Sequence, residues 1–124
     1  MSYNDLKKVH QYQTADGRVP VSEWLDGLRD ARARARIVAR LDRLSAGLLG
    51  DWSGVGESVC ELRIDYGPGY RVYYAQDGKA LILLLCGGDT RTQAKDIEKA
   101  HDYWKDYKVR KLAVSSGEAS EKPS

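Results

Sequence analysis

The order of apolar and polar positions in the first half of the chain predicts one strand followed by two helices. Leu6–Gln13 alternates weakly between apolar and polar residues, which predicts a short edge strand. Apolar residues at helical spacing predict a helix from Pro20 to about Arg29, because proline is tolerated in a first helical turn. A second apolar stripe, spaced by three and four residues, begins at Ala31 and stops at Gly47. These two helices are expected to form a hairpin.

The second half of the chain predicts three antiparallel strands joined by tight turns. Val59–Asp65 alternates, and the alternation resumes over Tyr70–Gln76 after the turn Tyr66–Gly69. The dipeptide Asp77-Gly78 is a strong hairpin signal. Ala80–Gly87 is apolar throughout, which is typical of a strand buried on both faces. That last strand is therefore expected at the centre of the sheet.

A terminal helix completes the predicted domain. Thr92 can cap its N-terminus, and its inward face carries Ile97, Ala100 and Trp104. Residues 113–124 are small and polar, which predicts a disordered tail. The pattern as a whole predicts an α+β, two-layer domain over residues 1–112, with an N-terminal strand, a two-helix hairpin, an antiparallel three-stranded meander and a C-terminal helix.

Length and composition restrict the class of protein. The chain has 124 residues, of which 42% are hydrophobic, enough for one globular domain. Cys60 and Cys86 have no histidine or cysteine at metal-ligand spacing, so we interpret both as reduced packing residues and expect no metal site. The first residues lack the apolar stretch of a secretory signal, and the longest apolar run is too short for a membrane span. We therefore expect a cytoplasmic protein with no membrane partner.

Several kinds of enzyme lose support because their motifs are absent from the sequence. Phosphate-binding loop, dinucleotide-binding, serine-hydrolase and zinc-protease motifs do not occur, and we expect no cofactor. His10 and His101 have no candidate nucleophile beside them in the sequence. We interpret His101 as a satisfied or solvated helix residue.

Two arginines occupy the polar phase of neighbouring predicted strands. Arg63 and Arg71 flank a short turn, so their side chains are expected to emerge close together on one face of the sheet. Two guanidinium groups repel each other unless an anion or an acid lies between them. One interpretation is therefore an anion-binding pair. The other is that Glu61 and Asp65 simply form cross-strand ion pairs with the arginines.

Lys95 is a third cation that such a site could include. It lies near the start of the last predicted helix, after Gly87 and Gly88, and a helix N-terminus approached by glycine backbone can bind a phosphate. An ordinary exposed lysine that forms ion pairs on the helix surface is the alternative.

Positive charge is concentrated in the second predicted helix. The chain has a net charge of only +2, but the segment from Arg29 to Gly50 contains six arginines and two aspartates. Four of these arginines follow one another at steps of four, four and three residues, which places them on one helical face. They are Arg32, Arg36, Arg40 and Arg43. This face is a candidate surface for a nucleic-acid backbone, or alternatively for solvent or an acidic partner.

One long segment is similar to a known family. Residues 61–107 contain GPGYRVYY, then LLLCGGD, then QAKDIEKA. With the upstream stretches VPVSEWLDGLRD and ARARIVARLDRL, this segment resembles the HigB-like "addiction module killer protein" branch of the RelE/ParE toxin superfamily. The likeness extends over residues 8–110 approximately.

The resemblance implies a small cytoplasmic toxin that inhibits translation by cleaving messenger RNA on the ribosome. It also implies a cognate antitoxin, usually with a helix-turn-helix domain through which the pair binds operator DNA. In such ribonucleases the chemistry is metal-free, because the ribose 2′-hydroxyl attacks its own adjacent phosphate. The related ParE branch inhibits DNA gyrase instead, and a repressor subunit without activity is a further alternative.

The resemblance also implies roles for particular residues. Arg63 and Arg71 would hold the scissile phosphate, and Lys95 would transfer a proton or hold phosphate. The four-arginine helical face, Tyr73 and Arg91 would bind RNA or the ribosome, since tyrosine rings stack on bases. Members of the family commonly have a lysine directly after GGD, where this chain has Thr90. Arg91 is a candidate substitute for that lysine.

Overall fold

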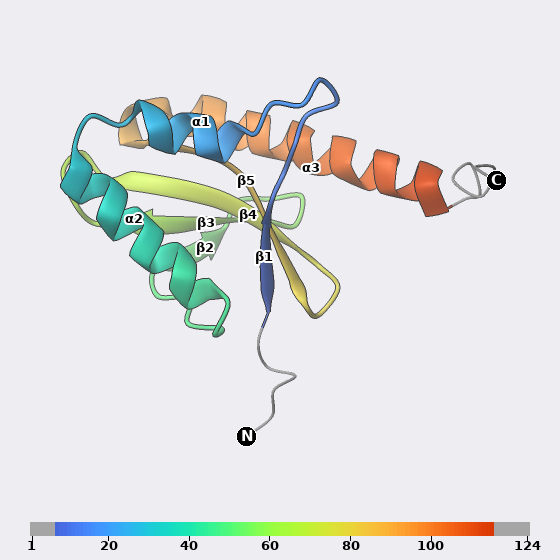
Figure 1. The fold of residues 1–124 in the computed structure, drawn as a ribbon, viewed down its shortest axis with the longest axis horizontal. Helices are drawn as coiled ribbons and strands as arrows, with labels where there is room; N and C mark the ends of the chain where they lie inside the picture. The colour runs from blue at the N-terminus through green and yellow to red at the C-terminus, as the bar shows by residue number, and fades with distance from the viewer. Residues whose placement is uncertain (1–6, 116–124) are drawn as a thin grey trace.

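A computed structural model describes residues 7–115 and contains, within that range, three α-helices and five strands (Figure 1). In chain order the elements are β1 (Lys8–Gln11), α1 (Pro20–Gly27), α2 (Ala31–Leu44), β2 (Trp52–Gly54), β3 (Val59–Ile64), β4 (Tyr70–Asp77), β5 (Leu81–Asp89), a 3₁₀ turn (Thr90–Thr92) and α3 (Gln93–Ser115). The α+β class and the predicted order of elements are confirmed.

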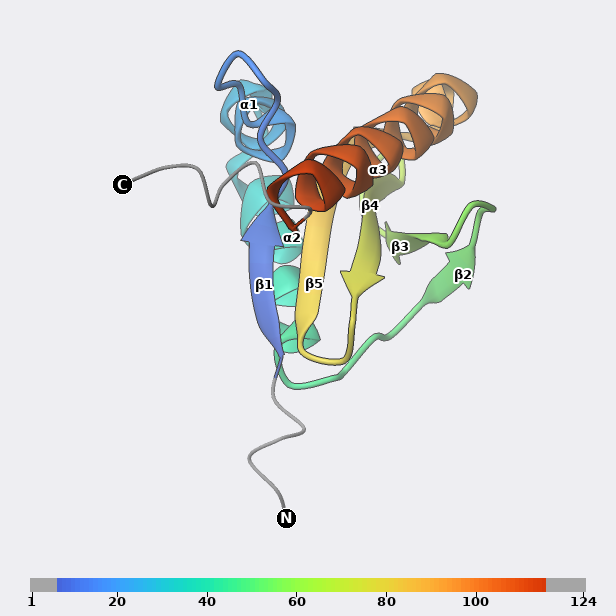
Figure 2. The ribbon, with the colours of Figure 1, turned by 90° about the vertical axis from the view of Figure 1, so that its right-hand side faces the viewer.

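The strands form one mixed sheet in the order β1-β5-β4-β3-β2 (Figure 2). The β3–β4–β5 meander is antiparallel, as predicted, and β5 lies inside the sheet, between β1 and β4. β1 pairs with β5 in parallel, and a parallel pair needs a long connection. After β1 the chain passes through α1 and α2 and enters the sheet again as β2, at the edge opposite β1. The sequence pattern missed β2, because a three-residue strand that ends in glycine has too few positions to show alternation.

The predicted two-layer arrangement is wrong, because helices cover both faces of the sheet. In Figure 2, α3 crosses in front of the strands and α2 lies behind them. One core, which includes Val72 and Ile82, packs against α1 and α2. A second core, which includes Tyr73 and Leu83, packs against α3. Both phases of β4 and β5 are thus buried, and such strands need a covering layer on each side.

Local interactions fix the connection between α1 and α2. The Asp30 side chain caps α2 by accepting hydrogen bonds from the backbone N–H groups of Arg32 (3.0 Å) and Ala33 (3.2 Å). The Arg34 guanidinium donates to the carbonyl oxygens of Leu25 (3.1 Å) and Leu28 (2.5 Å), just where α1 ends. These bonds satisfy carbonyls that the end of α1 leaves unpaired.

The start and the length of α3 differ from the prediction. Asp89 caps the 3₁₀ turn that leads into the helix, since its carboxylate accepts the N–H of Arg91 (2.9 Å), while the Thr92 hydroxyl donates to the Asp96 carboxylate. α3 continues to Ser115, so positions 113–115 of the predicted disordered tail are helical. Positions 116–124 of that tail, and Leu6 of the predicted first strand, lie outside the described residues.

The cysteines are free, as predicted. Cys60 is half-buried and Cys86 is buried, and burial raises the thiol pKa of both, to about 12 for Cys86. In the described part of the chain, no three or more side chains of histidine, cysteine, aspartate or glutamate gather as metal ligands. Across residues 7–115, no helix combines the length and the apolar character that a membrane crossing requires.

Gly87 and Gly88 at the end of β5 let α1 and α3 approach the sheet from opposite sides. A Cβ atom on Gly87 would collide with the ring of Trp24 in α1. On Gly88 it would collide with the carboxylate of Asp96 in α3. The space beside the glycine backbone, which suggested a phosphate site, is thus filled by the protein's own side chains.

Replacing Gly87 by alanine is expected to destabilise the fold by about 1–3 kcal/mol, because the rigid Trp24 ring must shift to admit the added methyl group. Chemical denaturation measures this loss of unfolding free energy. Gly27→Ala is the matched control, since a Cβ atom there meets nothing within 4 Å. Equal stability of the two variants would contradict the proposed close packing.

Candidate functional site

Arg63 and Arg71 face each other directly across β3 and β4. They are paired positions in the antiparallel register, so both side chains lie on the face of the sheet that α3 partly covers. Both line a surface depression of about 350 Å³, together with Asp51, Thr90 and the turn between β3 and β4. The predicted convergence of the two arginines is thus confirmed.

A buried carboxylate lies beside both guanidinium groups. Glu61 is only 1% exposed, and its Oε2 atom accepts hydrogen bonds from Gln93 Nε2 (2.8 Å) and the Tyr73 hydroxyl (3.1 Å). Arg63 Nη1 lies 3.5 Å from Glu61 Oε1, and Arg71 Nε lies 3.2 Å from Oε2. The Arg71 contact is an ion pair without hydrogen-bond alignment, since that N–H has no hydrogen-bond acceptor. Glu61 therefore offsets the repulsion between the arginines.

The outward side of Arg63 binds a second carboxylate. Arg63 Nη2 lies 2.7 Å from Asp51 Oδ1 and Nε lies 3.2 Å from Oδ2, while Nη1 points to Ser53 Oγ (3.3 Å). The Arg63 guanidinium lowers the pKa of Asp51, and the charges of Arg40 and Arg71 act in the same direction. Asp51 therefore lies near three positive charges, those of Arg63, Arg40 and Arg71.

The outward side of Arg71 binds Thr90. The Arg71 Nη1 group donates to Thr90 Oγ1 (2.7 Å), and the Thr90 backbone N–H donates to the Gly69 carbonyl (3.0 Å). Thr90 thus joins the end of β5 to the β3–β4 turn and orients Arg71. Arg91, next in sequence, is 81% exposed and forms an ion pair with Asp89 at 2.7 Å. It does not line the depression.

The predicted arginine face on α2 lies partly beside this depression. Arg40 donates to the backbone carbonyls of Arg63 (2.7 Å) and Leu49 (3.0 Å), and so it anchors α2 to β3. Arg36 stacks over the Tyr66 ring at 4.6 Å. A second depression, of about 250 Å³, contains Arg36, Arg40 and Arg43. The two depressions share Ile64 and Asp65 in their linings, so the cationic surface is continuous, and Arg32 is exposed in the first turn of α2.

Lys95 does not join the two arginines. Gln93 and Ile97 face the sheet from the first turns of α3, and Lys95 lies about half a helical turn away from both. Its side chain is exposed, and it is not among the residues that line either depression of the cationic surface. The sequence-based grouping of Lys95 with Arg63 and Arg71 is therefore wrong.

Tyr73 cannot stack on an RNA base in this structure. Its side chain is fully buried under α3, and its hydroxyl is bonded to Glu61. Of the two neighbouring tyrosines, Tyr70 is buried and Tyr66 is half-buried beneath Arg36. Alternation placed Tyr73 on the face that carries the arginines, but that face is covered by α3 at Tyr73.

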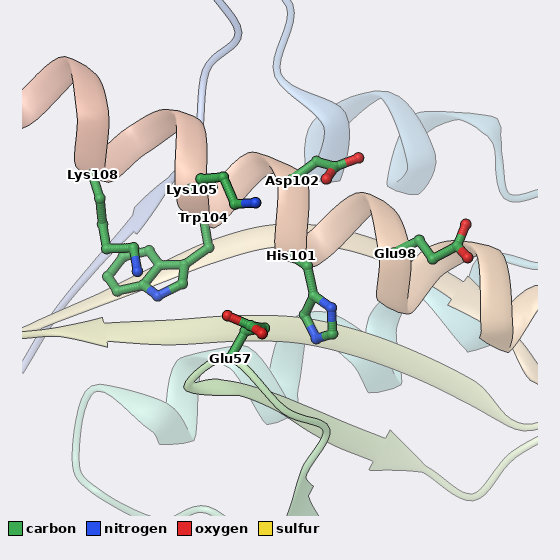
Figure 3. Close-up of a pocket in the computed structure, with 7 residues that line it drawn as sticks. All are labelled: Glu57, Glu98, His101, Asp102, Trp104, Lys105 and Lys108. Carbon is green, nitrogen blue, oxygen red and sulfur yellow. The ribbon is translucent and has the colours of Figure 1, made fainter.

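His101 lies in a different pocket, of about 300 Å³, between α3 and the loop that precedes β3 (Figure 3). Its Nε2 atom lies 3.0 Å from the Val55 carbonyl, an acceptor, so this nitrogen carries the proton. The interpretation of His101 as a satisfied helix residue is confirmed.

Sequence reasoning missed Asp51, Gln93 and the orienting role of Thr90. Glu61 was recognised only as an ion-pair partner, although strand phase does place it on the face that carries the arginines. Asp51 lies in a glycine-rich loop where no periodicity marks it. Gln93 and Thr90 reach the site through contacts between distant positions, which no local pattern contains.

Comparison with other proteins gives one clear relationship. No protein-family model matches the chain. An uncharacterized protein of Haemophilus influenzae is 51% identical to it over 77 residues, which cover 62% of this chain and 78% of that protein. The chain belongs to the family of that protein.

Replacing Glu61 by alanine is expected to cost about 3–5 kcal/mol of unfolding free energy, because it removes the buried counter-charge beside both guanidinium groups and leaves only the exposed Asp51 on the outer side of Arg63. Glu61→Gln keeps the size of the side chain and one acceptor, so its loss is expected to be smaller. Denaturant titration measures both values. Asp65→Ala, at an exposed carboxylate beside the same depression, should lie within about 0.5 kcal/mol of the wild type. A Glu61→Ala protein as stable as this control would refute the counter-charge role.

Proposed function

We propose that this protein is the toxin of a type II toxin-antitoxin module and cleaves messenger RNA on the ribosome. The observation that carries the proposal is the pair Arg63 and Arg71, held in register beside a buried carboxylate and opening on a surface depression. The resemblance of residues 61–107 to the HigB-like branch of the RelE/ParE superfamily supports the same function.

The chemistry that fits these residues is an internal transfer at phosphorus. The ribose 2′-oxygen bonds to the adjacent phosphorus, the bond to the 5′-oxygen breaks, and a cyclic phosphate and a 5′-hydroxyl remain. One proton leaves the 2′-hydroxyl and one reaches the departing 5′-oxygen. Extra negative charge develops on the phosphorus-bound oxygens, and fixed positive groups lower the barrier by stabilising that charge.

The two arginines are suited to charge stabilisation and not to proton transfer. A guanidinium group stays protonated in proteins, so Arg63 and Arg71 act on the phosphate oxygens. Glu61 keeps both groups in position before substrate arrives, which is the arrangement that electrostatic catalysis needs. Lys95, on the outer face of α3, takes no part in the proposed step.

The wider surface fits the proposed partners. The depression continues into the one lined by Arg36, Arg40 and Arg43, so an RNA backbone can follow the arginines from β3 to α2. An acidic segment of a cognate antitoxin, with a helix-turn-helix domain that contacts operator DNA, would cover the same charges. The proposed activity is cytoplasmic, because its proposed partners are the ribosome, messenger RNA and an antitoxin.

Primer extension on messenger RNA from a purified translation system tests this proposal. Wild-type protein is expected to produce cuts in phase with codons that depend on the ribosome, and Arg71→Ala is expected to reduce them at least about 100-fold. Lys95→Ala is the control, and its activity should stay within about twofold of the wild type.

The other outcomes identify different functions. Growth arrest in cells without cuts would reject the endonuclease and favour a gyrase inhibitor of the ParE kind. If the protein causes neither cuts nor growth arrest, the remaining function is that of a repressor subunit with a toxin's fold. Loss of cleavage in Lys95→Ala would show that the ribosome-bound site includes the outer face of α3.

Thr90 gives a second test of the same site. Thr90→Val removes the hydroxyl that accepts from Arg71, and cleavage is expected to fall about tenfold, since a hydrogen bond to a charged group is lost. Thr90→Ser keeps the hydroxyl and should retain most of the activity. The rate of cleavage at a single codon measures both effects, and equal rates for the two variants would contradict the orienting role of Thr90.

A further inference from the structure

The outward edge of Arg63 is already occupied in the free protein. Nε and Nη2 both lie within hydrogen-bond distance of the Asp51 carboxylate, at 3.2 and 2.7 Å. Nη1 is directed elsewhere, toward Ser53 and Glu61. Any oxyanion that binds Arg63 through two parallel hydrogen bonds must therefore use the same edge that Asp51 uses.

A phosphate and a carboxylate suit this edge equally well. Both present two oxygen atoms at the spacing of two guanidinium N–H groups, and both carry negative charge. Asp51 also lines the depression in which Arg63 and Arg71 meet, and it flanks Arg63 on the β2 side of the sheet, so a phosphate that takes the outward edge of Arg63 must take the place of its carboxylate. The Asp51 side chain is thus a mimic of the proposed ligand, supplied by the protein itself.

Asp51 can leave this position without unfolding the site. Its side chain is 58% exposed and that of Arg63 is 37% exposed, and ion pairs open to solvent are weak. The backbone N–H of Arg63 donates separately to the Asp51 carbonyl (2.8 Å), which holds the chain in place. Rotation of one short side chain is therefore enough to free the outward edge of Arg63.

We propose that Asp51 is a built-in competitor for the phosphate site, and that the RNA backbone displaces it from Arg63 when substrate binds. The inference rests on the proposed function in naming RNA as the ligand. It adds that the free protein binds an isolated RNA phosphate weakly, because the ligand must first break the Asp51 pair and then lie near the displaced carboxylate. Asp51 thus sets the affinity of the site and is not needed to build it.

Binding to a fluorescein-labelled 2′-O-methyl hexaribonucleotide tests this inference, because that probe carries RNA phosphates and cannot be cleaved. Fluorescence anisotropy is recorded for the full chain as wild type, Asp51→Asn and Asp65→Asn. In Asp51→Asn the new amide keeps the shape of the carboxylate and can still accept one hydrogen bond from Arg63, so the fold is expected to persist, and the thermal midpoint verifies this. Asp65→Asn makes the same change of charge beside the same depression, without an ion pair to either arginine among the described contacts.

Asp51→Asn is expected to bind the probe about five- to tenfold more tightly than the wild type, and Asp65→Asn less than about twofold more tightly. Adding Arg63→Ala to Asp51→Asn should abolish the gain. Equal gains in the two single variants would overturn the inference, since charge alone and not competition would then explain them. No binding by any variant up to millimolar probe would overturn it as well.

The translation assay keeps the two proposals separate. Tighter binding by Asp51→Asn without any cuts by the wild type would support the competitor and reject the endonuclease. Ribosome-dependent cuts by the wild type, with unchanged binding in Asp51→Asn, would support the endonuclease and reject the competitor role of Asp51.

Discussion

Two guanidinium groups that face each other on neighbouring strands repel, and the site depends on the buried carboxylate that offsets this repulsion. Glu61 is held in turn by Tyr73 from β4 and by Gln93 from the first turn of α3. The carboxylate therefore joins both strands to the helix, and the position of Arg71 depends on where α3 begins. A buried charge of this kind is costly without its partners. Loss of Arg63, Arg71 or Glu61 is therefore expected to destabilise the other two.

The close packing of α3 against the end of β5 gives Glu61 its environment. Gly87 lets Trp24 contact the sheet on one face, and Gly88 lets Asp96 and Thr92 lie against it on the other. Gly88 is also the register partner of Arg71, so the first turn of α3 meets the sheet directly beside the arginine pair. Gly88 serves the site indirectly, because it lets the first turn of α3, which carries Gln93, lie against the sheet, and neither glycine leaves space for a ligand of its own.

Local sequence patterns were sufficient for the elements other than β2 and for the pairing of the arginines, and insufficient for what surrounds the arginines. Alternation and the Asp77-Gly78 turn fix the β3–β4–β5 meander, and the meander brings Arg63 opposite Arg71. Alternation alone could not distinguish a strand face covered by a helix from an open one, and for that reason Tyr73 was assigned to RNA and the fold to two layers. Lys95 was misplaced even though the predicted inward face of α3, with Ile97, Ala100 and Trp104, was right, since Lys95 lies two positions before Ile97 and outside that face. The contacts of Arg71 with Thr90 and of Glu61 with Gln93 span 19 and 32 positions, so no local window contains them.

The surface arginines divide into those that build the site and those that remain available to a ligand. Arg40 is committed to backbone carbonyls, and its loss would disturb β3 before it affected binding. Arg63 and Arg71 each direct one side toward Glu61 and the other toward the depression, so they are positioned by the fold and still face solvent. An arginine held on its inner side loses little freedom when an anion binds to its outer side, and that saving in entropy favours binding. The exposed carboxylate of Asp51 opposes the same binding, so the affinity of the site reflects both the rigidity of the pair and the group that already covers it.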